Sequence, residues 1–111
     1  MNESRYPWFI LVPEREDVTE IYELSKVDQA LLLRESSTLA QGLAEAFAGD
    51  KLNIASLGNL VPQLHVHHVV RYRNDPAWPA PVWGKFPPLA YDEVEISAVV
   101  ARLEASLNQP L

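Results

Sequence analysis

The sequence contains no cysteine and no long apolar run. The absence of cysteine excludes disulfides and thiolate zinc sites, and it removes any sign of an oxidising compartment. The longest wholly apolar run, Trp8 to Val12, is far too short to cross a bilayer. The opening residues also lack the basic and apolar regions of a signal peptide. We therefore expect a cytoplasmic protein with no membrane partner.

Cationic residues are scarce: nine Lys and Arg stand against fifteen Asp and Glu, for a net charge of -6. Non-specific nucleic-acid binding depends on cationic surface, so no nucleic-acid partner is expected. A net negative charge does not exclude binding of a small anionic ligand by a few local cations. A length of 111 residues predicts one domain, residues 1–111, with a single core.

The hydrophobic pattern predicts an α+β fold. Aromatic and branched residues from Tyr6 to Pro13 are typical of a strand. A long helix is predicted from Lys26 to about Ala48, with Ser25 as its N-cap and Gly49 at its end. Its apolar stripe comprises Val27, Leu31, Leu32, Leu39, Leu43, Ala46 and Phe47.

The second half of the chain adds two more strands and a second helix. Leu52–Ala55 and the run that ends at Arg71 are predicted to form a hairpin. The proline- and tryptophan-rich segment from Asp75 to Pro88 is not expected to form regular structure. Asp92 then caps a C-terminal helix. The result is an antiparallel sheet with one long helix and a C-terminal helix, whose inner side is formed by Ile96, Val99, Val100, Leu103 and Leu107.

All three histidines lie within four residues of one β-branched run, at positions 65, 67 and 68. Side chains alternate between the faces of a strand. One face would carry an amide, two imidazoles and two guanidiniums, and the other would pack into the core. The first face comprises Gln63, His65, His67, Val69, Arg71 and Arg73, and the second Leu64, Val66, His68 and Val70.

Three interpretations of these histidines compete. Lone histidines in a sheet are usually solvated or hydrogen-bonded, and His68 on the apolar face fits that role. His65 and His67, two positions apart, could ligate zinc, but a catalytic zinc site needs a third protein ligand and Asp75 lies beyond the strand. The third interpretation is nucleophilic catalysis on phosphorus, with one imidazole attacking and the other contacting the same phosphate. Only this one uses the alternation, both imidazoles and the two arginines, Arg71 and Arg73, together.

The run from Val61 to Arg71 resembles the signature of the histidine triad (HIT) family, which alternates His and hydrophobic residues and ends in an arginine. Further matches include Phe9–Pro13, Glu23–Ser25, Leu52–Ile54 and Gly58–Asn59. The loop with Trp78 and Trp83 is similar to one bacterial branch of HIT hydrolases, although these two tryptophans are expected mainly to pin the loop onto the domain. The resemblance implies a five-stranded antiparallel sheet and a homodimer, with no cofactor and no metal.

The resemblance also implies roles for individual residues. His65 would be the nucleophile that accepts a nucleotidyl group. His67 would contact the phosphate through its side chain and orient His65 through its backbone carbonyl. The substrate-binding residues would be Asn53, Asn59, Gln63 and Arg71.

Two departures from the family pattern affect the functional interpretation. Gln63 replaces the first histidine; its amide donates a hydrogen bond but cannot shuttle a proton. We expect the family's N-terminal segment, which forms part of the nucleoside-binding wall, to be missing before Arg5. We expect a hydrolase or nucleotidyl transferase acting on nucleoside phosphoramidates or dinucleoside polyphosphates. The alternative is a non-catalytic nucleotide-binding module on the same fold.

Overall fold

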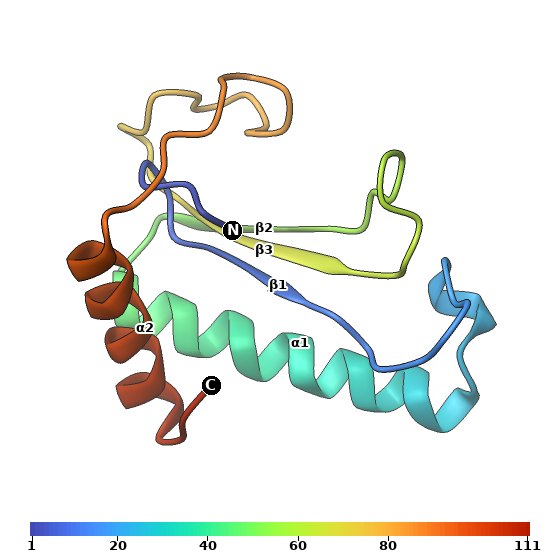
Figure 1. Ribbon diagram of the computed structural model, residues 1–111. Helices are drawn as coiled ribbons and strands as arrows, with labels where there is room; N and C mark the ends of the chain where they lie inside the picture. Colours follow the sequence, from blue (N-terminus) through green and yellow to red (C-terminus); the bar gives the residue numbers. More distant parts are fainter.

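A computed structural model describes residues 1–111 and shows an α+β arrangement. Three antiparallel strands form one sheet in the order β1-β3-β2. Figure 1 shows helix α1 running along one face of this sheet, with α2 beside the C-terminal end of α1. The elements are β1 (Trp8–Leu11), the 3-10 turn η1 (Ile21–Glu23), α1 (Lys26–Phe47), β2 (Lys51–Ala55), β3 (Val66–Arg71) and α2 (Glu93–Leu107).

Helix α1 begins where the sequence predicted and ends one residue earlier. The Ser25 side chain accepts a hydrogen bond from the Asp28 amide, as expected of an N-cap. The left-handed residue at the C-terminus is Ala48, with φ of 48°, and not Gly49. Gly49 has a different reason to be glycine: a Cβ there would run into the Val70 side chain and the Arg71 carbonyl. The glycine therefore lets the chain pass close to β3.

The core lies between the helices and the sheet. Two groups of buried side chains fill it, one containing Leu24, Leu32, Leu64 and Val66 and the other Leu43, Phe47, Val70 and Leu103. Burial of these apolar side chains is the main stabilising contribution to such a fold.

Part of each predicted apolar stripe is instead exposed. Val27 and Leu31 of α1 and Ile96 of α2 are exposed. A helix of 22 residues is about 33 Å long, whereas a strand of six residues spans about 20 Å. The first turn of α1, which carries Val27, therefore extends past the strands (Figure 1).

Strand β3 is shorter than the sequence predicted. The expected antiparallel pairing with β2 is present, with Asn53 opposite Val69. The strand begins only at Val66, so His65 precedes it. Gly58 has a φ of 84° and Pro62 lacks an amide N–H, so neither favours an extended ladder before His65. The sheet accordingly has three strands and not the five that the family resemblance implied.

The face of the sheet opposite the helices is also covered. Side chains of the proline-rich loop, Ala77 and Val82, pack with Tyr6, Trp8 and Val69 into a third buried group. The loop appears above one end of the strands in Figure 1. All six residues of β3 are consequently buried, and the open polar row expected from the alternation does not exist over the length of the strand. No helix combines the length and apolarity needed to cross a membrane.

Candidate functional site

His65 and His67 lie side by side at the start of β3. Their ring centroids are 4.9 Å apart, and the rings meet edge to face at 67°. His67 is the second residue of the strand, whereas His65 stands just before it. The structure therefore brings together the two imidazoles that the sequence paired, although only one belongs to the sheet.

The His65 ring is held through its Nδ1 atom. The backbone carbonyl oxygen of Gln63 lies 2.7 Å from Nδ1. A carbonyl only accepts hydrogen bonds, so Nδ1 must carry the proton. In the neutral ring the lone pair then lies on Nε2, which is the atom a nucleophile needs free. The family resemblance implies that the His67 carbonyl has this orienting role, and that prediction is wrong. The chain bends before the strand, so the Gln63 carbonyl reaches the ring instead.

The His67 ring is enclosed by aromatic side chains. Only 8% of His67 is exposed. The Trp8 indole Nε1 donates to His67 Nδ1 over 2.9 Å, and the Trp83 ring centroid lies 5.6 Å from the His67 ring. Burial, followed by repulsion from His65, lowers the pKa of His67. The ring is therefore held neutral near pH 7. Sequence reasoning missed the role of Trp8, which β1 places opposite Val69 on the same face as His67.

His68 has the structural role that the sequence predicted. It points to the helix side of the sheet and is fully buried. Its Nδ1 donates to the Val66 carbonyl at 3.1 Å, and its Nε2 lies 2.7 Å from the Ser36 hydroxyl of α1. Burial lowers the pKa of His68. This histidine joins β3 to α1 and takes no part in the candidate site.

Arg71 lies within a buried network and not on an open surface. The side chain is 1% exposed, and its guanidinium contacts both carboxylate oxygens of Asp75 at 2.8 and 3.0 Å. Two further donors reach the Ala80 carbonyl and the Asn53 side-chain oxygen, each at 2.9 Å. The guanidinium thus anchors the proline-rich loop to β2 and β3. The sequence signal for this network is the carboxylate four residues after the arginine.

Asn53 is oriented by this network. The Oδ1 atom of Asn53 accepts a hydrogen bond from Arg71, which fixes the orientation of the side-chain amide. The two N–H donors on Asn53 Nδ2 therefore point away from Arg71, and no protein group accepts from them. Asn53 is half-buried and lies opposite Val69, on the same face of the sheet as His67.

The remaining predicted site residues lie in loops. Gln63 is half-buried, and its side-chain amide donates to the Arg15 carbonyl at 3.1 Å. Asn59 is exposed in the segment between β2 and β3. Arg73 is exposed beyond the end of β3, where its backbone amide and its guanidinium both approach Asp50. The structure therefore separates Arg73 from the polar face to which the alternation assigned it.

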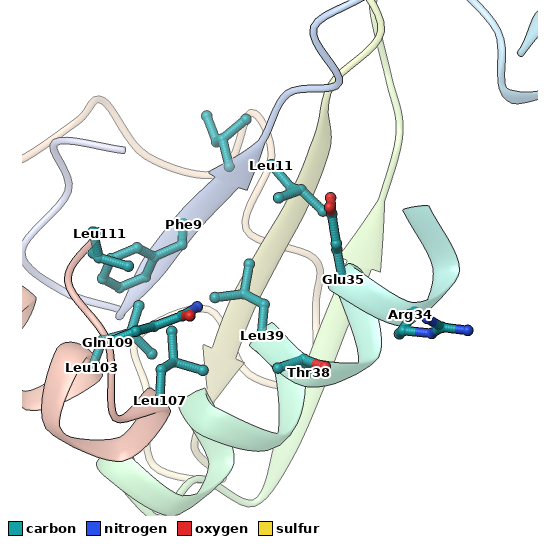
Figure 2. A pocket seen from close by; sticks show the side chains of 11 residues that line it. Phe9, Leu11, Arg34, Glu35, Thr38, Leu39, Leu103, Leu107, Gln109 and Leu111 are labelled. Atoms are coloured by element: carbon teal, nitrogen blue, oxygen red, sulfur yellow. The ribbon is translucent and has the colours of Figure 1, made fainter. Parts of the chain in front are cut away.

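The zinc interpretation gains no third ligand in the structure, and the apolar hollow between the sheet and the helices is a separate feature. No group of three His, Cys, Asp or Glu side chains is placed to hold a metal ion. A hollow of about 490 Å³ lies on the opposite face of the sheet, against the helices (Figure 2). Its lining is largely apolar and includes Phe9, Leu11, Leu39, Leu103 and Leu107. It contains no histidine and is separate from the paired imidazoles.

Comparisons with known proteins agree on one family. The family model of the HIT domain, which describes the sequences of that family, matches residues 1–74 of this chain. A solved histidine triad protein from Marinobacter aquaeolei VT8 is 54% identical to this chain, with a TM-score of 0.94. The match covers 100% of this chain and 81% of that protein's chain. A histidine triad protein from Sinorhizobium meliloti 1021 is 45% identical, also with a TM-score of 0.94. This match covers 96% of this chain and 78% of that protein's chain.

A more distant structure shares the fold alone. It is described as a hypothetical histidine triad nucleotide-binding protein from Sulfolobus tokodaii strain7, and it is 16% identical with a TM-score of 0.73. The match covers 92% of this chain and 70% of that one. No curated protein matches the sequence.

Proposed function

Because this chain belongs to the histidine triad (HIT) family, whose members commonly bind and hydrolyse nucleotides, we propose that it is a nucleotide hydrolase or nucleotidyl transferase. The reaction would pass through a covalent intermediate in which His65 carries the nucleoside monophosphate group. The substrates would be nucleoside phosphoramidates or dinucleoside polyphosphates. The observation that carries the proposal is the bond from His65 Nδ1 to the Gln63 carbonyl, because it leaves the lone pair on Nε2.

The reaction has two displacements at the same phosphorus atom. His65 Nε2 attacks the α-phosphorus, a P–N bond forms to the ring, and the bond to the leaving amine breaks; the amine takes up a proton from solvent. Water then attacks the same phosphorus and releases a proton to solvent. The P–Nε2 bond breaks, its electron pair returns to His65, and nucleoside monophosphate leaves. Splitting one difficult displacement into two easier ones is the general advantage of nucleophilic catalysis.

Donors around the imidazoles would hold the phosphate. The free N–H groups of Asn53 lie on the His67 face of the sheet, and neutral donors of this kind stabilise negative charge in a partly dry site. The N–H donors of Arg71 already bond Asp75, Asn53 and Ala80. Arg71 would therefore act on the phosphate indirectly, by fixing the orientation of the Asn53 amide. Asn59 and Gln63 would contact the nucleotide from the loop before β3.

Steady-state hydrolysis of an adenosine phosphoramidate tests this proposal. We expect the wild-type protein to release AMP, and His65→Ala to lower kcat by at least about 1000-fold, as removal of a nucleophile does. Arg73→Ala serves as the control, because it removes an exposed cation from the other end of β3. Release of AMP by His65→Ala at the wild-type rate would refute the proposal.

Gln63 motivates a second candidate, a nucleotide-binding module with little or no turnover. Its amide cannot shuttle a proton, and it already donates to the Arg15 carbonyl. Calorimetric titration with AMP beside the turnover assay separates the two candidates. Binding without release of AMP from the phosphoramidate would favour the module.

The resemblance to the family further implies a cytoplasmic homodimer, which we propose as the working state of the protein. Light scattering on a sizing column measures this directly. A mass of twice 12.5 kDa is expected, and a mass of 12.5 kDa at the concentrations used in the assays would contradict it.

A further inference from the structure

The bond between Trp8 and His67 determines where the His67 proton lies. An indole N–H donates and cannot accept, so the Nδ1 atom that lies 2.9 Å from it must be the unprotonated nitrogen. A protonated ring would place two N–H groups against each other. The neutral ring therefore carries its proton on Nε2, and Trp8 selects that tautomer.

The surroundings of His67 favour the same state. The titratable groups that act on its ring are His65, the N-terminal ammonium group and His68, and all of them disfavour a positive charge on it. Trp8 and Trp83 pack around the ring from β1 and the proline-rich loop, while Ile10 and Ala55 are its strand neighbours. No carboxylate hydrogen-bonds to the ring. Charged His67 thus has no local counter-ion.

His65 and His67 are held in opposite tautomers as a result. His65 has its proton on Nδ1 and its lone pair on Nε2, and His67 has the reverse arrangement. The two rings are 4.9 Å apart, which lets one contact a phosphorus atom while the other contacts an oxygen bonded to it. No protein group accepts a hydrogen bond from His67 Nε2, so that donor is free for a ligand.

We propose, on the basis of the function above, that Trp8 is a positioning residue: its indole N–H fixes His67 in the Nε2–H tautomer, so that His67 donates to a non-bridging oxygen of the phosphate that His65 attacks. A neutral donor with a fixed direction needs no reorganisation when charge develops on that oxygen. Trp8 does not touch the substrate itself, and its contribution depends entirely on His67.

Nitrogen-15 NMR of the histidine side chains tests the first half of the proposal without any substrate. In the wild-type protein near pH 7 we expect the His67 Nδ1 shift of an unprotonated nitrogen and the Nε2 shift of an N–H nitrogen. The opposite pattern, or an imidazolium, would overturn the proposal. This result depends neither on catalysis nor on the folding of any variant.

Two matched variants test the second half. Trp8→Phe keeps an aromatic ring and removes the N–H, whereas Trp83→Phe removes an indole that also packs on His67 but donates to no partner. In Trp8→Phe we expect a mixture of His67 tautomers, a midpoint of His67 titration shifted to higher pH, and a kcat lowered by roughly tenfold with little change in KM. Trp83→Phe should leave the tautomer and the titration midpoint unchanged.

The outcomes separate this inference from the proposed function. Loss of kcat in Trp8→Phe with an unchanged His67 tautomer and titration would show a merely structural role for Trp8 and overturn the inference. An unchanged kcat with a changed tautomer would overturn it as well. If His65 forms no covalent adduct, the proposed function fails, and the NMR result still reports whether Trp8 sets the state of His67.

Discussion

Arg71 and Asp75 form a bidentate ion pair that is almost wholly buried, with side chains 1% and 2% exposed. Asp75 also accepts hydrogen bonds from the backbone amides of Tyr72, Ala77 and Trp78. One carboxylate thus ties the start of the proline-rich loop to the end of β3. Because the loop covers the His67 face of the sheet, this pair also controls how the candidate site is enclosed.

Replacing Asp75 with Asn should destabilise the protein strongly. Removing one partner leaves the Arg71 charge buried without its counter-ion, which typically costs about 3–5 kcal/mol. Urea unfolding at neutral pH measures the loss. Asp50→Asn is the control, because the Arg73–Asp50 contact is 4.0 Å long and exposed, and such pairs contribute about 1 kcal/mol or less. Equal losses in the two variants would refute the role assigned to the buried pair.

The same carboxylate should make the protein sensitive to acid. Although burial opposes its ionisation, the Arg71 hydrogen bonds and the backbone amides lower the pKa of Asp75 from 3.8 to about 2. The folded state therefore holds the proton less tightly than the unfolded state. Its contribution, roughly 2 kcal/mol, is present above pH 4 and is lost as pH falls towards 2. Unfolding measured across this range should show a fall in stability that is smaller in Asp75→Asn.

The burial of His68 predicts a second pH dependence of the free energy of unfolding, at higher pH than that of Asp75. Burial lowers the pKa of His68 in the folded state, so the unfolded chain takes up a proton at higher pH than the folded chain does. The free energy of unfolding should therefore decrease as pH falls from about 7 to 5. His68→Gln removes this titration and should make the decrease shallower, with His67 accounting for part of what remains. Ser36→Ala is the matched control, since it deletes the hydroxyl partner but leaves the imidazole. An undiminished slope in His68→Gln would contradict the prediction.

Restoring a histidine at position 63 should preserve or raise the rate. An imidazole there could supply the proton that the leaving amine otherwise takes from solvent. The backbone carbonyl that holds His65 is unaffected by the side chain, so the tautomer of His65 should persist. Comparison of kcat for Gln63→His and the wild type checks this. A large loss would mean that the amide itself, through its bond to Arg15 or through the substrate, is required.

Much of the architecture could be predicted because local signals were strong. The Ser25 and Asp92 caps, the helical spacing of leucines and the β-branched run each identify an element without reference to the rest of the chain. The pairing of His65 with His67 followed from the same alternation. The assignment of His68 to the core also held, since its partner Ser36 lies on the helix that covers that face.

The surroundings of the site could not be predicted from alternation alone. A strand pattern says which side chains share a face but not what covers that face, and here a loop without regular structure covers it. Burial of Arg71 depends on Asp75 and Ala80, whose positions follow from the path of that loop. Similarly, the bond from Trp8 to His67 joins residues 59 positions apart in sequence, and no local pattern indicates it.

A covalent bond from His65 Nε2 to phosphorus is the central step of the proposed reaction, and intact-mass spectrometry tests for it most directly. The protein is incubated briefly with an adenosine phosphoramidate and quenched, with His65→Ala treated in parallel. We predict an adduct of one adenylyl group on the wild-type protein, assigned to His65 by fragmentation and absent from the variant. An adduct that persists in His65→Ala, or AMP release by the wild type with no adduct under any quench time, would contradict the account.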